Sequence, residues 1–192
     1  MNDTETFRAV PGSETKTIPV ICSWCGKIMD TKKWSVLQGE AIAPDYGICP
    51  DCHKKVRIGS GKPAPERGLG KTYRILIVDD EAGFCKMLFE VLHPFGYRLL
   101  TCNDGADAVE YYARLHTDID LVLLDMKMSE MDGYETFMNM KRINPFIRAI
   151  VVTGYARDNE IRTMLAVGAL CVMEKPFNPV TLIERIRDVL PP

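Results

Sequence analysis

The chain has 192 residues, of which 46% are hydrophobic and 26% are charged, and its formal net charge is −2 at pH 7. These values are typical of a globular protein with one medium domain and room for a small second one. No apolar run reaches about 18 residues, and the polar N-terminus lacks the apolar segment of a signal peptide, so we expect a cytoplasmic protein without membrane contact. Seven cysteines in that compartment argue against a disulfide framework.

The N-terminal part divides into a polar tail and a cysteine-rich segment. Residues 1–17 are polar and aperiodic, and we expect them to be disordered. The segment that follows, residues 18–57, contains two Cys-x-x-Cys pairs, Cys22 with Cys25 and Cys49 with Cys52. Each pair can give two thiolates to one Zn²⁺, and two pairs complete a tetrahedral site without an open position. About forty residues are too few for a self-sufficient core, so a structural zinc site is expected.

Other interpretations of the cysteine-rich segment stay open at this point. A redox dithiol would need only one pair and a thioredoxin-like strand context, which is absent. His53 could replace a cysteine ligand, although four cysteines suffice. Trp24 and Trp34 are interpreted as a small core rather than a stacking platform. Residues 21–28 and 46–52 resemble a cysteine-rich, zinc-ribbon-like module that is attached to some bacterial signalling proteins.

The charge of the cysteine-rich segment bears on nucleic-acid binding. Residues 18–57 carry six Lys or Arg and four acidic residues, and four thiolates with one Zn²⁺ would add −2, which leaves a net charge of about zero. Phosphate binding usually needs a clear basic excess. Two lysine pairs, 32–33 and 54–55, could still form one patch, but a protein-contact role is favoured over DNA binding.

A linker precedes the larger second half. Residues 58–71 contain four glycines and two prolines, which is typical of a flexible linker. Residues 72–192 alternate strand and helix patterns in five βα units, which predicts a doubly wound α/β domain. Strands are expected near residues 73–78, 97–102, 119–124, 148–153 and 170–174. A helical apolar stripe is formed by Phe84, Met87, Leu88, Val91 and Leu92.

Polar residues stand where the predicted strands end. Asp79 and Asp80 follow the first strand, and Asp125 closes the third. Thr153 ends the fourth strand, and Lys175 follows the fifth. Ligands of doubly wound folds bind beyond the carboxyl ends of the strands, so these side chains are expected to form one site. Converging carboxylates repel one another, and a divalent cation such as Mg²⁺, which prefers oxygen ligands, would remove the repulsion.

The order and spacing of these residues resemble the receiver domain of two-component response regulators, the CheY-like family, over about residues 72–190. The resemblance implies a flavodoxin-like parallel sheet of five strands in the order 2-1-3-4-5. It also implies that Asp80 and Asp125 bind Mg²⁺ directly, together with the backbone carbonyl of Lys127. Asp79 would act mostly through a coordinated water.

The resemblance further implies how the site works. Asp125 would attack a phosphohistidine of a partner kinase and become an acyl phosphate, while Thr153 and Lys175 bind the phosphoryl oxygens. Such a domain is a phosphoacceptor switch with weak self-catalysis and not an enzyme with a separate substrate. The added phosphoryl charge would change the surface that the last two helices and the last strand form.

Three positions depart from the commonest pattern of the family. Val172 stands where an aromatic residue usually reports phosphorylation, which puts the standard output coupling in doubt. Ser129 stands where proline is frequent, and the expected effect is on loop stiffness. Lys127 is expected to overhang the site, where it either shields the acyl phosphate or is a solvated lysine.

The sequence therefore predicts a response regulator of a two-component phosphorelay with Mg²⁺ and Zn²⁺ as cofactors. Expected partners are a sensor histidine kinase or a histidine phosphotransfer protein and an unidentified output protein; a phosphorylation-dependent homodimer is left open. The chain ends soon after the last predicted helix, so a conventional C-terminal output domain is not expected. The alternatives are a transcription regulator that binds DNA through the zinc module and, less favoured, a degenerate receiver that serves as a scaffold.

Overall fold

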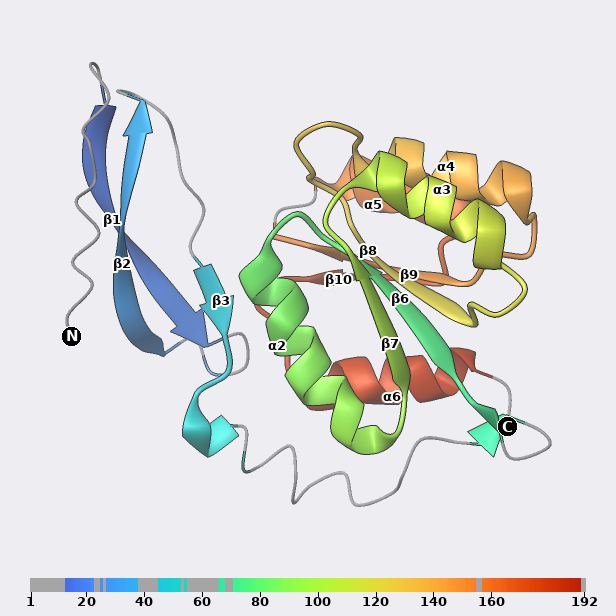
Figure 1. The fold of residues 1–192 in the computed structure, drawn as a ribbon, viewed down its shortest axis with the longest axis horizontal. Coiled ribbons are helices and arrows are strands. Elements are labelled where there is room, and N and C mark those ends of the chain that lie inside the picture. Colours follow the sequence, from blue (N-terminus) through green and yellow to red (C-terminus); the bar gives the residue numbers. More distant parts are fainter. Residues whose placement is uncertain are drawn as a thin grey trace.

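The structure contains a small N-terminal sheet and a larger C-terminal α/β unit (Figure 1). The computed structural model describes residues 13–22, 25, 27–37, 45–52, 54, 66–67, 71–154 and 157–190. Across these ranges, no helix combines the length and the apolar character that crossing a membrane would require.

The C-terminal unit is built on a five-stranded parallel sheet with the order β10-β9-β8-β6-β7. Its strands are β6 (Arg74–Val78), β7 (Arg98–Cys102), β8 (Leu121–Asp125), β9 (Ala149–Thr153) and β10 (Cys171–Glu174). Numbered within this unit, the order is 2-1-3-4-5, so the predicted topology is confirmed. All five predicted strands lie within a few residues of their expected positions.

Helices cover both faces of this sheet. They are α2 (Ala82–Leu92), the 3₁₀-helix η1 (His93–Phe95), α3 (Gly105–Leu115), α4 (Gly133–Ile143), α5 (Asp158–Ala166) and α6 (Pro179–Val189). α2 and α6 pack on one face, and α3, α4 and α5 pack on the other (Figure 1). In β6, Ile75 and Ile77 belong to the core under α2 and α6, whereas Leu76 and Val78 belong to the opposite core. Because helices cover both faces, the three central strands β6, β8 and β9 are almost continuously apolar.

The N-terminal unit is a three-stranded sheet in the order β2-β1-β3. β1 (Ser13–Cys22) pairs antiparallel with β2 (Ile28–Leu37) and parallel with β3 (Asp45–Gly47). The expectation of disorder up to residue 17 is wrong for residues 13–17, because their backbone pairs with β2. Residues 1–12 lie outside the described part of the chain. We call the described part of residues 13–54, with β1, β2, β3 and the four clustered cysteines, the cysteine module.

The segment between the two units is described only at its C-terminal end. There β4 (Glu66–Arg67) and β5 (Lys71–Thr72) pair antiparallel, so the predicted linker contains a short hairpin where only flexible chain was expected. Residues 55–65 and 68–70 of this segment lie outside the described residues.

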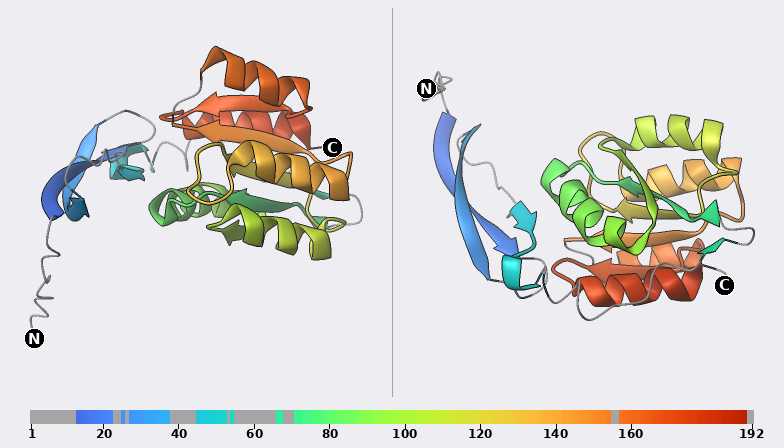
Figure 2. Two further views of the ribbon diagram at one scale, coloured as in Figure 1. Left: turned by 90° about the horizontal axis from the view of Figure 1, so that it is seen from above. Right: turned by 60° about the horizontal axis from the view of Figure 1, so that its bottom comes forward.

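The cysteine module contacts the α/β unit beside α2. β3 lies next to α2, as both views of the ribbon agree (Figures 1 and 2). Ile48, the residue after β3, packs against the cysteine cluster and also against the core that α2 and α6 cover. The sequence alone left open whether the two units touch; here they share an apolar contact.

Candidate functional site

The polar residues that the sequence places at strand ends do meet at one edge of the sheet. Lys175 lies between them with 1% of its side chain exposed. Its Nζ is 2.7 Å from Asp79 Oδ2 and 3.1 Å from Asp125 Oδ1. A third carboxylate, Glu81, has its Oε1 3.9 Å from the same Nζ. One buried ammonium therefore faces three acidic side chains.

Burial and crowding control the charges in this cluster. Burial raises the pKa of Asp79 to about 6, a shift that Lys175 opposes and the charge of Asp125 reinforces. Burial likewise raises the pKa of Glu81 to about 7 and shifts the pKa of Asp125 upward. For Lys175, burial alone lowers the pKa, but the surrounding carboxylates outweigh it and the net direction is upward. Negative charge is in excess, and a second cation would relieve it.

Backbone donors from the loop after β8 orient two of the carboxylates. The Lys127 N–H donates to Asp125 Oδ2 at 2.7 Å, and the Ser129 N–H donates to Asp80 Oδ2 at 3.0 Å. A proline at position 129 would have no N–H to donate. Ser129 thus connects the loop after β8 to the loop after β6, a role beyond the loop stiffness expected from the sequence.

Glycine at position 133 keeps this loop against the end of β8. The Gly133 N–H donates to the Met126 carbonyl at 3.0 Å, and Asp132 accepts from the Glu135 N–H at 2.8 Å to cap α4. A Cβ at position 133 would lie 2.2 Å from the Asp125 carbonyl oxygen, which is closer than any real contact. The Asp-Gly sequence therefore lets the backbone of Asp125 and the start of α4 approach closely.

Lys127 differs from the expected arrangement. Its Nζ lies 2.9 Å from Glu160 Oε1 in α5, so its side chain is paired with α5 rather than extended over the acidic residues. The hydrogen bond from Lys127 lowers the pKa of Glu160. This exposed pair connects the loop after β8 to the first turns of α5.

Thr153 and Val172 lie on the strands beside the site. Thr153 is fully buried at the end of β9, and its carbonyl accepts from the Lys175 N–H at 2.6 Å, which fixes β10 against β9. Val172 is half-buried and packs against the core under α3, α4 and α5. The position where the family often has an aromatic residue is therefore used here for packing.

Two residues of this site were missed from the sequence. Glu81 is one of them, although it directly follows the acid pair and its position was a usable signal. The other is Phe84, which the helical stripe predicted only as a core residue. The Lys175 Nζ lies 3.8 Å from the centroid of the Phe84 ring, and the Phe177 ring packs perpendicular to that ring with centroids 5.9 Å apart. Phe84 is the aromatic surface against which the ammonium is held.

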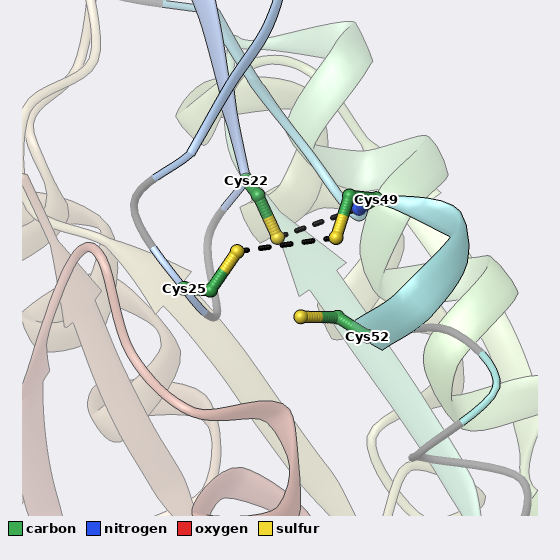
Figure 3. A group of neighbouring side chains, drawn as sticks. All are labelled: Cys22, Cys25, Cys49 and Cys52. Carbon is green, nitrogen blue, oxygen red and sulfur yellow. Dashed lines mark hydrogen bonds between the residues drawn. The ribbon is translucent and has the colours of Figure 1, made fainter.

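The four cysteines of the cysteine module form a second cluster. The sulfur atoms of Cys22, Cys25, Cys49 and Cys52 all lie within 4.8 Å of one another and point toward a common centre (Figure 3). Cys22, Cys49 and Cys52 are buried, and the Cys49 N–H points at Cys22 Sγ at 3.4 Å. Burial first, and the neighbouring thiols second, raise the pKa of Cys52. Four sulfur ligands in a tetrahedral arrangement suit Zn²⁺, which would hold them as thiolates.

The remaining cysteines are small core residues, as predicted. Cys85 is buried, and Cys102 and Cys171 are half-buried against the two cores. Burial raises the pKa of Cys85 to about 12, which disfavours its reactive thiolate.

Comparison with known proteins identifies the C-terminal unit. Residues 75–187 match the family described as the response regulator receiver domain. The chain belongs to the response regulator receiver family. This chain is 30% identical over 129 residues to the chemotaxis protein CheY of Treponema pallidum, a match that covers 67% of this chain and 90% of that protein. It is 38% identical over 117 residues to sporulation initiation phosphotransferase F of Bacillus subtilis, covering 61% of this chain and 90% of that protein.

The receiver fold also matches solved structures. One is the CheX–CheY–BeF₃–Mg²⁺ complex from Borrelia burgdorferi, with a TM-score of 0.61 and 28% identity over 62% of this chain and 90% of that chain. The α/β receiver assignment made from the strand-end residues is confirmed. The family match begins at residue 75, so the cysteine module lies outside it.

The receiver residues fit a magnesium ion by the chemistry of their donors. Asp79, Asp80 and Asp125 offer only oxygen atoms, and burial first, with the charge of a neighbouring carboxylate as a smaller cause, raises the pKa values of Asp79 and Asp125. Mg²⁺ prefers one or two carboxylates and keeps several waters. These side chains could hold it beside the Lys175 ammonium.

Proposed function

We propose that Asp125 is the phosphoacceptor through which this two-component response regulator receives its signal. The carboxylate of Asp125 is 5% exposed, accepts a hydrogen bond from the Lys127 N–H, and lies 3.1 Å from the Lys175 ammonium. That geometry is the main observation in favour of the proposal. Lys175 holds one carboxylate oxygen of Asp125 and the Lys127 N–H holds the other, so the side chain has a fixed orientation. Phosphoryl transfer depends on positioning and charge neutralisation more than on covalent help.

In the proposed reaction, an oxygen atom of Asp125 attacks the phosphorus of a phosphohistidine. A P–O bond to Asp125 forms, and the P–N bond to the histidine breaks. Lys175 neutralises part of the charge on the phosphoryl oxygens, and the buried Thr153 donates its hydroxyl to them. The phosphoryl group is later hydrolysed, so the receiver acts as a switch with weak self-catalysis and not as an enzyme with a separate substrate.

Asp80, Asp125 and the backbone carbonyl of Lys127 are proposed to hold Mg²⁺, with Asp79 acting through a water. A bound Mg²⁺ would supply positive charge at the transferred phosphoryl group. The Ser129 N–H orients Asp80, and the Lys127 N–H orients Asp125, so both carboxylates are prepared for this role.

The cysteine module is proposed to bind one structural Zn²⁺ through Cys22, Cys25, Cys49 and Cys52. The four sulfur atoms already lie within 4.8 Å of one another, which is the observation in favour. Four protein ligands leave no position for a substrate, so the site would stabilise the module rather than catalyse a reaction.

Partners follow from the same proposal. A sensor histidine kinase or a histidine phosphotransfer protein would supply the phosphoryl group, and an output protein would respond to it. A similar protein, CheY of Borrelia burgdorferi, forms a complex with CheX. We also propose a cytoplasmic location and protein contact as the output.

Incubation with acetyl phosphate and Mg²⁺, followed by intact mass measurement, tests the phosphoacceptor. We expect the mass of one phosphoryl group to be added to the wild type and to the exposed control variant Asp188→Asn, but not to Asp125→Asn. An unchanged gain in Asp125→Asn would contradict the proposal. Metal analysis of protein purified without chelator tests the other site, and a chain without zinc would contradict that assignment.

A further inference from the structure

Ile48 connects the cysteine cluster to the receiver. Its half-buried side chain packs on the cysteine cluster and on the core under α2 and α6. It directly precedes Cys49 in the chain, and β3 just before it lies beside α2 (Figure 1). The same short backbone segment therefore positions a metal ligand and a contact with the receiver.

Besides the pairing of β3 with β1 and the buried Ile18 of β1, which lies outside the cysteine cluster, few contacts of the cysteine module hold this segment in place. The buried members of its apolar cluster are Cys22, Cys49 and Cys52, and the residues packed against them are Met29 and Ile48. Of the larger apolar side chains on β2, Ile28 is 60% exposed and Leu37 is 63% exposed. Because these contacts cannot support a core, the order around Cys49 depends on a metal at the centre of the four thiols.

On the receiver side, α2 supports the acidic loop. α2 begins directly after Asp79, Asp80 and Glu81. The Cys85 thiol donates to the Asp79 carbonyl at 3.3 Å, and the Phe84 ring lies under the Lys175 ammonium. Both α2 residues belong to the core against which Ile48 packs. A contact that steadies α2 therefore also steadies the carboxylates that precede it.

We propose that the cysteine module is a metal-dependent brace on α2. With a metal in the cysteine cluster, Ile48 stays against the receiver core, and the loop that carries Asp79 and Asp80 keeps its geometry. Loss of the metal releases Ile48 and loosens the start of α2. The metal content of the module is thus a second input to the receiver; this inference rests on the proposed zinc and phosphoacceptor sites.

The effect of the metal in the cysteine cluster on α2 can be measured in the wild-type chain. Amide hydrogen exchange of α2 and of α4 is compared, in the absence of Mg²⁺, for zinc-loaded protein, for protein stripped by a chelator under reducing conditions, and for protein reloaded with zinc. We expect exchange in the first turns of α2 to rise severalfold on stripping and to recover on reloading, since local opening reports local stability. Exchange in α4, on the opposite face of the sheet, serves as the internal control and stays constant.

Two matched variants separate the contact from the metal. Ile48→Glu removes the apolar contact and keeps all four cysteines, whereas Ile28→Glu places the same charge at an exposed position of the module. We expect zinc-loaded Ile48→Glu, but not Ile28→Glu, to reproduce the faster α2 exchange and to weaken Mg²⁺ binding by about fivefold, the lower end of common coupling strengths. Coupling between two binding free energies is reciprocal, so the factor by which zinc strengthens Mg²⁺ binding in the wild type should equal the factor by which Mg²⁺ strengthens zinc binding, measured at equilibrium in competition with a chromogenic chelator.

The outcomes distinguish this inference from the proposed function. If stripping leaves α2 exchange and Mg²⁺ affinity unchanged while zinc binding and phosphorylation by acetyl phosphate are normal, the brace is refuted and the two sites stand. If the purified chain contains no zinc, the zinc assignment fails, and with it the metal dependence of the brace. If Ile48→Glu does not retain zinc, the comparison of zinc-loaded, stripped and reloaded wild type still tests whether the metal stabilises α2.

Discussion

At the scale of single residues, the charge balance of the acidic site depends on Lys175. Its ammonium is buried between Asp79 and Asp125, within 2.7 and 3.1 Å of their oxygen atoms. One positive charge does not balance Asp79, Asp125 and Glu81 together, and burial first, with repulsion between carboxylates second, raises the pKa values of these carboxyls. Buried carboxylates therefore repel one another at the place where a cation would bind.

This arrangement predicts a pH-dependent stability difference between the wild type and Asp79→Asn. The folded protein holds a proton on Asp79 up to a pKa of about 6, above the ordinary value of 3.8, so the ionised group destabilises the folded state as pH rises. The free energy of unfolding of Asp79→Asn, minus that of the wild type, should increase between about pH 4 and pH 6 and level off above. Two pKa units correspond to about 3 kcal/mol as an upper limit.

Denaturant unfolding in a chelator at several pH values measures this difference. Asp188→Asn, which changes an exposed carboxylate, should show a constant difference across the same range. A difference for Asp79→Asn that stays flat or falls with rising pH would refute the assignment of the raised pKa.

A second residue-scale prediction concerns the Lys127–Glu160 pair. Both charges are in contact with solvent, so breaking the pair should change the free energy of unfolding very little. Glu160→Gln frees the Lys127 ammonium, which can then move toward a phosphoryl group on Asp125 and shield it. We expect slower loss of the phosphoryl group in Glu160→Gln than in the wild type. Lys127→Ala should lose it at a rate close to that of the wild type, because the Lys127 ammonium of the wild type is already held on Glu160.

The decay of phosphorylated protein, followed by intact mass after removal of acetyl phosphate, tests this prediction. Equal decay rates in the wild type and both variants would remove any role for Lys127 in shielding. The sequence could suggest Lys127 from its distance to Asp125, but not its pairing with Glu160. That pair joins residues 33 positions apart and depends on how α5 begins.

At the scale of elements, the junction of β8 and α4 is the tightest part of the site. A methyl group at position 133 would collide with the Asp125 carbonyl oxygen, which is backbone and cannot rotate away. We expect Gly133→Ala to lower the free energy of unfolding by about 1–3 kcal/mol and to slow phosphorylation by acetyl phosphate, because the carboxylate of Asp125 is displaced.

Gly154→Ala is the matched control, since nothing lies within 4 Å of a Cβ at that exposed position after β9. Thermal unfolding and the rate of mass increase with acetyl phosphate would be compared for both variants. A Gly133→Ala protein as stable and as reactive as Gly154→Ala would show that the loop has room to move.

The strands also show which parts of the fold could be predicted from the sequence. The central strands of the receiver are buried on both faces, so their apolar runs and the polar residues that end them, Asp79, Asp125 and Thr153, could be located from the pattern. The order of the sheet was predicted from the resemblance to the receiver family. β1 could not, because its first residues are polar and largely exposed and become a strand only by pairing with β2. Polarity alone therefore predicted disorder for residues 13–17, where backbone pairing decides the structure.

At the scale of the whole molecule, the contact between the two units had no signal in the sequence. The Gly- and Pro-rich composition of residues 58–71 predicts reach and flexibility, and it contains no information on where the module docks. The contact through Ile48 depends on the shape of β3 and on the apolar surface beside α2, which exist only after both units have folded. Hence the sequence showed the cysteine pairs, but it did not show that the cysteine module would contact the receiver beside α2.

We expect the full chain not to bind generic duplex DNA at moderate salt. Lys32 and Lys33 are consecutive residues of β2, so their side chains point to opposite faces of the sheet and cannot join one basic patch. Asp30 is two residues before Lys32 and lies on the same face of β2, where it offsets the positive charge. With a net charge near zero on the zinc-loaded module, too few cations face one side to release counterions from a phosphate backbone.

Fluorescence anisotropy of labelled duplex DNA, at low and moderate salt and with or without Mg²⁺ and beryllofluoride, tests this prediction. We expect at most weak binding at low salt that disappears at moderate salt and does not depend on beryllofluoride. Binding that persists, strengthens with beryllofluoride and weakens in Lys32→Glu would instead make the module a DNA reader. The absence of binding would direct attention to proteins that recognise the receiver surface or the module braced against α2.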